Sequence, residues 1–259
     1  MYLIKSTFIR KCLFVVFLFA STFQTKAASK DTVRVLFVGN SYIYYNNLIQ
    51  MIGLITDSLD TKIMCKKSVI GSATLGEHWN GSRGLQSRKI IANGRFDAVV
   101  IQDNSMRPLE FKDSVLYYGG LFCKAIKTKG AKPYLYNTWA RQKTPETQTA
   151  INAVYQELAK NEGATNVPIG NCWARALEIN KDVVLFHPDG SHPSAMGTFM
   201  IALGFIKQIT GKIPEKYATV YNYIDKDGET FRIMQLTEAE IQFCVRVVNE
   251  VIPGNLNKQ

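Results

Sequence analysis

Short apolar segments alternate with longer amphipathic segments along most of the chain. Val33–Val38 is largely apolar and rich in β-branched residues, which is typical of a buried strand. Leu48–Leu59 has apolar residues at helical spacing, and Thr61–Val69 and Asp97–Gln102 indicate two further strands. Continuous apolar runs of this kind suit parallel strands that are covered by helices on both faces.

The same alternation continues through the second half of the chain. The pattern predicts helices at Ser114–Lys127, Thr144–Asn161, Asn171–Ile179 and Ala195–Ile209, and strands at Ala131–Asn137 and Thr165–Ile169. Strands that alternate with helices in this way predict an α/β fold, with a parallel sheet in three layers (α/β/α) and right-handed crossovers.

The C-terminal part has a different pattern. Asp227-Gly228 lies between Tyr221–Ile224 and Thr230–Met234, and predicts a tight hairpin. Asp225 and Asp227 also suggest a calcium loop, but the remaining ligands are missing, so we interpret the segment as a turn. Thr237 to Glu240 has the spacing of a capping box that opens a last helix. We expect this hairpin and helix, at about 217–252, to pack on the main domain.

The N-terminal residues predict export. Basic residues within 1–11 precede an apolar run from Cys12 to Phe23, and small residues follow at 27–28. This pattern is typical of a signal peptide over residues 1–28, which places the mature protein in the periplasm or outside the cell. The apolar run is short for a membrane span, so we expect no stable membrane insertion after cleavage. At 259 residues the chain can form one large core, and residues 29–259 are expected to form a single domain.

Charge and cysteine usage argue against several functions. Four of the 31 Lys and Arg residues lie in 1–28, which leaves 27 basic against 21 acidic residues, a surplus of +6. The basic residues are scattered and form no run, which argues against nucleic-acid binding. The remaining cysteines are widely spaced, which argues against a zinc site; they are Cys65, Cys123, Cys172 and Cys244. In an oxidising compartment some of them can pair, and buried free thiols are an equal alternative.

The first candidate catalytic residue is Ser41, in the sequence Gly39-Asn40-Ser41 at the end of the first predicted strand. Ligands of open α/β sheets bind at the carboxyl ends of the strands, so a serine there is presented to a crevice. By itself, such a serine is more typical of a helix N-cap than of a nucleophile. Acyl transfer by Ser41 needs a base, a carboxylate that orients the base, and donors for the oxyanion.

One of the three histidines of the chain has suitable partners. Asp189 precedes His192 by three residues in a turn, so its carboxylate can reach Nδ1 while Nε2 faces the crevice. His187 is the rival base, but its spacing from Asp189 is less favourable. His78 and Trp79 can line a pocket for the acyl group or sugar, although packing on a helix is the preferred interpretation.

These blocks, in this order, resemble the SGNH (GDSL-type) hydrolases. The resemblance runs from about Val33 to Ile209, and its most specific element is Asp189-x-x-His192-Pro193 followed by a helix. Three other blocks contribute to it: Gly39-Asn40-Ser41, Gly71 in a loop of small residues, and the polar cluster at 102–105. An extracytoplasmic subgroup of the superfamily, often described only as a domain of unknown function, has motifs similar to Gly39-Asn40-Ser41, His78-Trp79 and Gln102-x-x-Ser105.

The resemblance implies a flavodoxin-like fold with a central parallel five-stranded sheet. It also implies a serine esterase mechanism that uses a catalytic triad and no metal or cofactor. Carried over by position, Ser41 is the nucleophile, His192 is the general base and then the acid, and Asp189 is the orienting carboxylate.

The family's oxyanion donors map less directly onto this chain. The resemblance implies the backbone N–H groups of Ser41 and Gly71, together with a side-chain amide from the third block. The family usually has Gly-x-Asn-Asp there, whereas this chain has Gln102-Asp103-Asn104-Ser105. Gln102 and Asn104 both offer the amide, and Gln102 is preferred because it ends the strand.

We therefore expect an exported esterase that removes a small acyl group, with acetyl on a carbohydrate as the leading substrate. Its partner would be a small-molecule or polysaccharide ester. A non-catalytic glycan-binding module and a lipase or thioesterase for longer acyl chains are the alternatives on the same fold. A nucleotide-binding protein is disfavoured because no Gly-rich phosphate loop follows the first strand. The sequence gives no indication of the oligomeric state.

Overall fold

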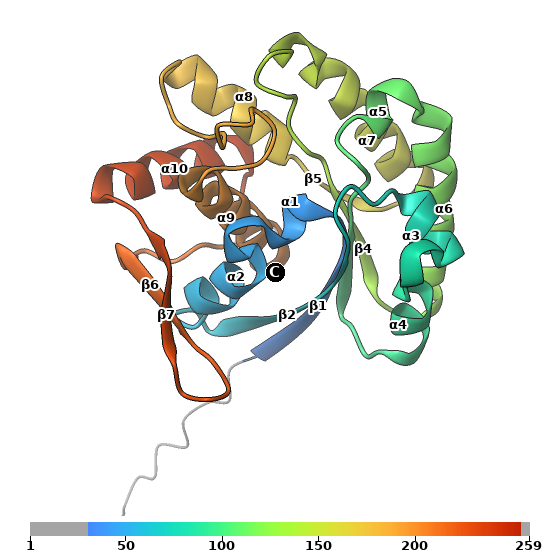
Figure 1. Ribbon diagram of the computed structural model, residues 1–259, viewed down its shortest axis with the longest axis horizontal. Helices are drawn as coiled ribbons and strands as arrows, with labels where there is room; N and C mark the ends of the chain where they lie inside the picture. Colours follow the sequence, from blue (N-terminus) through green and yellow to red (C-terminus); the bar gives the residue numbers. More distant parts are fainter. Residues whose placement is uncertain (1–30, 255–259) are drawn as a thin grey trace, which may run out of the picture.

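The sheet at the centre of the molecule has five parallel strands (Figure 1). In the computed structural model, which describes residues 31–254, they lie in the order β2-β1-β3-β4-β5. Their bounds are Asp31–Gly39 for β1, Thr61–Val69 for β2, Ala98–Ile101 for β3, Lys132–Tyr136 for β4 and Thr165–Val167 for β5. The predicted signal peptide, residues 1–28, lies outside the described residues.

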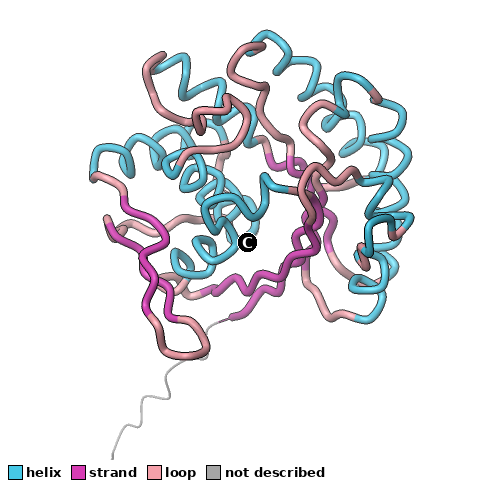
Figure 2. The backbone as a smooth tube through the Cα atoms, in the orientation of Figure 1, coloured by secondary structure: helices cyan, strands magenta, loops and turns pink. Residues whose placement is uncertain are grey.

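Helices cover both faces of the sheet, which Figure 2 shows nearly edge-on. One layer holds α1 (Ser41–Tyr44), α2 (Leu48–Thr56), α8 (Ile169–Ile179), α9 (Ala195–Thr210) and α10 (Glu238–Val251). The other holds α3 (Leu75–Asn80), α4 (Ser87–Asn93), α5 (Arg107–Glu110), α6 (Lys112–Thr128) and α7 (Gln148–Glu162). Short 3₁₀ turns lie at Tyr45–Asn47, Ser82–Gly84 and Pro145–Thr147. The predicted three-layer α/β/α fold is confirmed.

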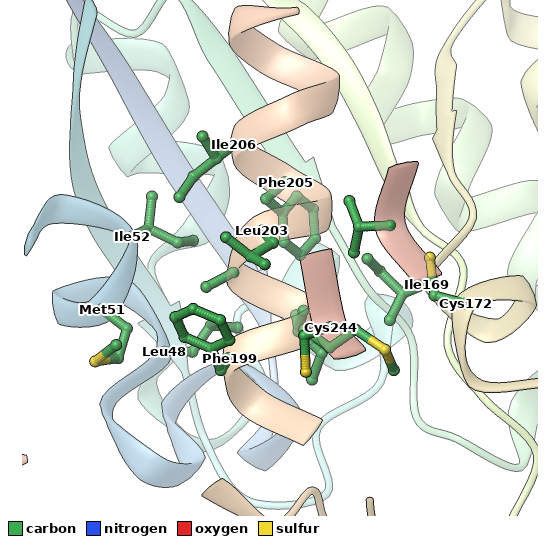
Figure 3. Close-up of a cluster of buried hydrophobic side chains, with 14 of the residues drawn as sticks. Leu48, Met51, Ile52, Ile169, Cys172, Phe199, Leu203, Phe205, Ile206 and Cys244 are labelled. Carbon is green, nitrogen blue, oxygen red and sulfur yellow. The ribbon is translucent and has the colours of Figure 1, made fainter. Parts of the chain in front are cut away.

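Helix α9 organises the larger of the two cores (Figure 3). Every residue from Met196 to Lys207 is buried, as expected for a helix that is enclosed on all sides. Its side chains pack against residues from three neighbouring helices: Leu48, Met51 and Ile52 from α2, Ile169 and Cys172 from α8, and Cys244 from α10. The second core, between the sheet and α6 and α7, is centred on Phe122, Ile151 and Leu158.

The C-terminal elements add to the α9 layer. Strands β6 (Val220–Ile224) and β7 (Thr230–Gln235) pair antiparallel, and their buried side chains, Tyr221 and Met234, join the larger core. At the tip, Asp225 Oδ1 accepts hydrogen bonds from two backbone N–H groups, as in a turn. Helix α10 begins with the predicted capping box. Among residues 31–254 we find no helix that is long and apolar enough to span a membrane.

Three features of the fold go beyond the sequence predictions. The loop with Asp189 and His192 follows helix α8 and is held by an isolated bridge between Phe186 and Pro193. The short helices α3, α4 and α5 were not predicted, because segments of four to seven residues are too short to show helical periodicity. The four cysteines after residue 28 are free thiols, which decides between the two alternatives.

The α9 core provides a test of this packing. Phe205 is fully buried, and its ring centroid lies 5.1 Å from that of Phe37 and 4.8 Å from that of Tyr136. We expect Phe205→Ala to lower the free energy of unfolding by about 3 to 5 kcal/mol, measured by urea denaturation, because it leaves a cavity. Phe231→Ala, on the exposed face of β7, should change it by less than about 0.5 kcal/mol. Equal effects would contradict this packing.

Candidate active site

Ser41 stands at the carboxyl end of β1, as the first residue of α1. Asn40 is the N-cap of that helix, and its side chain accepts a hydrogen bond from the Tyr42 N–H at 3.2 Å. A Cβ atom at Gly39 would lie 2.5 Å from Gln102 Oε1, so a larger residue does not fit there. The Gly-Asn-Ser sequence therefore suits a tight turn between strand β1 and helix α1. Ser41, at this turn, is only partly buried.

Asn40 connects the loops that follow three neighbouring strands. Its Nδ2 donates hydrogen bonds to the carbonyl oxygens of Ala73, at 3.1 Å, and of Asp103, at 3.4 Å. Its backbone N–H donates to Gln102 Oε1 at 3.1 Å. Asn40 is only 2% exposed, so these bonds are shielded from water. They hold the loops after β1, β2 and β3 in one arrangement around Ser41.

The three predicted triad residues converge in space. Ser41 Oγ lies 2.8 Å from His192 Nε2, although the two residues are 151 positions apart in the chain. His192 Nδ1 lies 2.6 Å from Asp189 Oδ2. The backbone N–H groups of Ser191 and His192 both donate to Asp189 Oδ1, at 2.9 Å each. A hydroxyl, an imidazole and a carboxylate are thus hydrogen-bonded in the order that serine acyl transfer requires.

The surroundings of Asp189 keep its carboxylate ionised. Partial burial works to raise its pKa, but hydrogen bonds from the Ser191 backbone and from the ring and backbone of His192 outweigh this effect. The pKa of Asp189 is therefore held well below its usual range. An ionised carboxylate at Nδ1 stabilises the imidazolium that forms when His192 takes a proton from Ser41.

The other two histidines lie elsewhere. His187 Nδ1 is 3.5 Å from Asp189 Oδ2, and its ring lies edge-on against Tyr45 at 5.4 Å; within residues 31–254 the histidine that hydrogen-bonds Ser41 is His192. His78 is almost fully buried: Nε2 lies 2.8 Å from the Gly39 carbonyl oxygen, and Nδ1 lies 2.6 Å from Ser87 Oγ. Burial lowers the pKa of His78, which favours a neutral ring that supports the backbone just before Ser41. Packing was the preferred interpretation of His78, but this support was not predicted.

The expected oxyanion donors are the backbone N–H groups of Ser41 and Gly71. Gly71 lies in the loop after β2, and its carbonyl oxygen accepts two hydrogen bonds from the Arg83 guanidinium, at 3.1 Å each. The next residue, Ser72, has a positive φ of 60°. Within residues 31–254, the N–H groups of Ser41 and Gly71 form no hydrogen bond.

Comparison with known proteins gives similarity in structure but not in sequence. No protein-family model and no curated protein matches the chain. A DUF4886 family protein from Bacteroides uniformis superimposes with a TM-score of 0.68 at 16% identity, covering 86% of this chain and 95% of that one. A putative SGNH hydrolase from Slackia heliotrinireducens gives 0.58 at 22% identity, covering 69% of this chain and 100% of that one. An acetyl xylan esterase gives 0.56 at 14% identity, with 68% and 100% covered.

This chain has the SGNH hydrolase fold. The expected resemblance is thereby confirmed at the level of the fold.

The third block of the SGNH fold shows where sequence reasoning was wrong. Gln102 is fully buried; its Oε1 accepts from the Asn40 N–H, and its Nε2 donates to the Asp103 carbonyl oxygen. Its amide is thus used inside the protein and does not face the crevice, so the preference for Gln102 is corrected. Asn104 is only partly buried, and its Nδ2 donates to the Ser72 carbonyl oxygen at 3.3 Å. Asn104 Oδ1 also accepts a hydrogen bond from the Met106 N–H at 3.1 Å, and of the two amides only that of Asn104 belongs to a partly exposed residue.

Asp103, between these two amides, has a structural role that was not predicted. Its Oδ1 accepts hydrogen bonds from the N–H groups of Leu75, at 3.1 Å, and Asn104, at 2.7 Å. Burial raises the pKa of this carboxyl group to about 6. In residues 31–254, Oδ2 has no hydrogen-bond partner. The polar cluster after the third strand was the available signal, but its burial was not visible in the sequence.

A stack of aromatic rings supports the histidine loop of the SGNH fold. The ring of Tyr42 stacks on Trp139 at 4.5 Å, and Trp139 stacks on Trp173 at 4.1 Å. Tyr42 and Trp139 also bond the loop: the Tyr42 hydroxyl lies 2.7 Å from Ser191 Oγ, and Trp139 Nε1 donates to the Ser191 carbonyl oxygen at 2.9 Å. His192 itself stacks on Tyr45 at 4.4 Å. Rigid rings therefore limit the movement of the imidazole.

The described part of the chain offers no obvious metal centre. Within residues 31–254, no group of three or more His, Cys, Asp or Glu side chains is arranged to hold a metal ion.

The buried carboxylate of Asp103 predicts a pH effect on stability. Its raised pKa means that the folded state holds this proton more tightly than the unfolded state does. The wild type therefore loses stability as the pH rises from about 4 to about 6. Asp103→Asn keeps the acceptor oxygen and removes the charge. We expect its free energy of unfolding, relative to wild type, to gain about 2 to 3 kcal/mol between pH 4 and pH 7.

This comparison is made by urea denaturation at several pH values. Asp182→Asn, which removes an exposed carboxylate, is the control for charge removal alone. A constant difference between Asp103→Asn and wild type across this pH range would show that the buried carboxyl is not shifted.

Proposed function

We propose that the protein is a serine esterase that hydrolyses a small acyl ester, with acetyl on a carbohydrate as the substrate. The observation that carries the proposal is the continuous set of contacts from Ser41 through His192 to Asp189 at the carboxyl edge of the sheet. The N–H groups of Ser41 and Gly71, which form no hydrogen bond within residues 31–254, support it, because acyl transfer also needs donors where the oxyanion develops.

In this mechanism, Ser41 Oγ attacks the ester carbonyl carbon while His192 Nε2 takes the hydroxyl proton. Asp189 stabilises the resulting imidazolium. The tetrahedral oxyanion is held by the N–H groups of Ser41 and Gly71 and by Asn104 Nδ2. Collapse of the intermediate breaks the bond to the alcohol, which leaves with the proton from His192. Water, activated by His192, then hydrolyses the acyl-serine and regenerates the enzyme.

The choice of substrate and location rests on the predicted export signal and on one structure with this fold. The predicted export signal favours action outside the cytoplasm, where carbohydrate esters are accessible substrates. One structure with this fold is described as an acetyl xylan esterase, at 14% identity. A lipase or thioesterase would prefer longer acyl chains, and a glycan-binding module would bind without turnover. A series of p-nitrophenyl esters from acetyl to dodecanoyl separates these alternatives.

The triad is tested with p-nitrophenyl acetate. We expect Ser41→Ala and His192→Ala each to lower kcat by about 10⁴-fold, because the nucleophile and its base act as one unit. His187→Ala is the matched control in the same loop and should lower kcat by less than about tenfold, since it does not contact Ser41. If the wild type has no activity, or if Ser41→Ala retains it, the esterase proposal fails.

The oxyanion donors are tested at Asn104. We expect Asn104→Ala to lower kcat by about 100-fold, which corresponds to the loss of one donor; a melting curve checks that the variant stays folded without the hydrogen bonds to Ser72 and Met106. Asn222→Ala, at an exposed asparagine on the hairpin, is the control and should leave kcat unchanged. A kcat within about twofold of wild type for Asn104→Ala would exclude this amide as a donor.

A further inference from the structure

Arg141 is a charged residue at the edge of the crevice that the proposed mechanism does not use. It lies in the loop after β4, and its Nη2 donates to Ser105 Oγ at 3.3 Å. Ser105 directly follows Asn104. Burial raises the pKa of the Tyr42 phenol, and the positive charge of Arg141 opposes that shift.

The Arg141 guanidinium has no acidic partner. It is exposed, and no carboxylate within residues 31–254 forms an ion pair with it. Asp189, the acidic group on the same side of the crevice, is held by the His192 ring and by two backbone N–H groups. The planar guanidinium fork matches a carboxylate in geometry and charge. A guanidinium that has no carboxylate partner in the described residues and bonds Ser105, next to Asn104, therefore suits a substrate that carries an anionic group.

Arg141 also lines a groove of about 500 Å³, which we call the α8 groove. Its apolar residues come from three segments of the chain: Pro145, Trp173, Leu177 and Phe186. Glu178 on its rim is paired with Arg175 at 3.2 Å. Lys181, also on the rim, is exposed and forms no ion pair within the described part of the chain. The unpaired charges of the groove, Arg141 and Lys181, are thus both positive.

The α8 groove is connected to the loop that carries the imidazole. The Gln142 N–H, in the groove wall, donates to the Gly190 carbonyl oxygen at 2.9 Å. Gly190 lies between Asp189 and His192, and Phe186 begins the same loop. On the inner side, Trp173 stacks on Trp139, which stacks on Tyr42. A ligand in the groove would therefore rest against the elements that position His192.

We propose that Arg141 and the α8 groove form a subsite for a glycan chain that bears carboxylates, as in a uronic-acid-containing oligosaccharide. This inference rests on the proposed esterase function and specifies its substrate class. Charge complementarity selects the occupant: the apolar floor packs against the C–H faces of sugar rings, and the two cations bind carboxylates. A hydrocarbon acyl chain in the same groove would leave both cations without a partner. The binding energy of the glycan in the α8 groove would then help to hold its ester group at Ser41.

The first experiment compares acidic and neutral substrates. It measures kcat/KM for acetylated oligogalacturonides and acetylated xylo-oligosaccharides of equal length. We expect wild type to prefer the acidic chain, and Arg141→Gln to reduce the ratio of acidic to neutral kcat/KM by about tenfold. Arg141→Lys should give an intermediate ratio, and Lys181→Gln a smaller reduction. Raising the salt concentration should weaken the preference of wild type. Lys129→Gln, an exposed lysine at the end of α6, is the matched control and should leave the ratio unchanged.

The second experiment measures binding without turnover. Titration calorimetry with unacetylated oligogalacturonate on Ser41→Ala should show binding that weakens about tenfold in the double variant with Arg141→Gln. Equal affinity for acidic and neutral chains, or a ratio of kcat/KM that Arg141→Gln does not change, would overturn the inference. A strong preference for long-chain p-nitrophenyl esters that Arg141→Leu increases would also overturn it, since the groove would then hold an acyl chain.

The two proposals fail in different ways. Binding of the acidic chain without hydrolysis of any ester by wild type would count against the esterase function alone. Hydrolysis of p-nitrophenyl acetate without preference for acidic chains would count against the α8 groove subsite alone. Absence of both binding and hydrolysis would overturn both.

Discussion

The arrangement around Ser41 depends on one buried amide, that of Asn40. Parallel strands bring their carboxyl ends to one edge of a sheet, but the loops beyond them have no regular hydrogen bonds to hold them together. Asn40 supplies those bonds to the carbonyl groups of Ala73 and Asp103. A buried carbonyl that loses its donor costs about 1 to 3 kcal/mol, so alternative loop arrangements are disfavoured. Ser41 and Asn104 are positioned by this common support.

Two carboxylates near the crevice have opposite environments. Asp189 is partly exposed and accepts hydrogen bonds from two backbone N–H groups and from His192, so its pKa is lowered and its charge persists. Asp103 is buried with one oxygen unpartnered, so its pKa is raised to about 6. An aspartate side chain thus holds the imidazole of His192 in the case of Asp189, and holds a loop in the case of Asp103. The environment, and not the residue type, assigns the role.

The aromatic stack connects the candidate site to the α8 groove. Tyr42, Trp139 and Trp173 form one continuous set of rings, with Tyr42 next to Ser41 and Trp173 at the groove. Stacked rings of this kind are rigid, so the position of the groove is fixed relative to Ser41. A substrate that reaches both regions would contact Arg141, which lies between Ser105 and the groove.

The sequence alone was enough to predict the strands, the long helices and their alternation. A strand that is buried on both faces of a parallel sheet appears in the sequence as a continuous run of apolar residues. The Asp189 and His192 pair was predictable for a related reason: three residues in a turn set their separation. Contact between His192 and Ser41 was only an expectation, since a distance across 151 residues depends on the packing of the sheet. Only the tertiary structure decided that Gln102 and Asp103 are buried and hydrogen-bonded inside the protein while Asn104 stays partly exposed, because adjacent polar residues look equivalent in sequence.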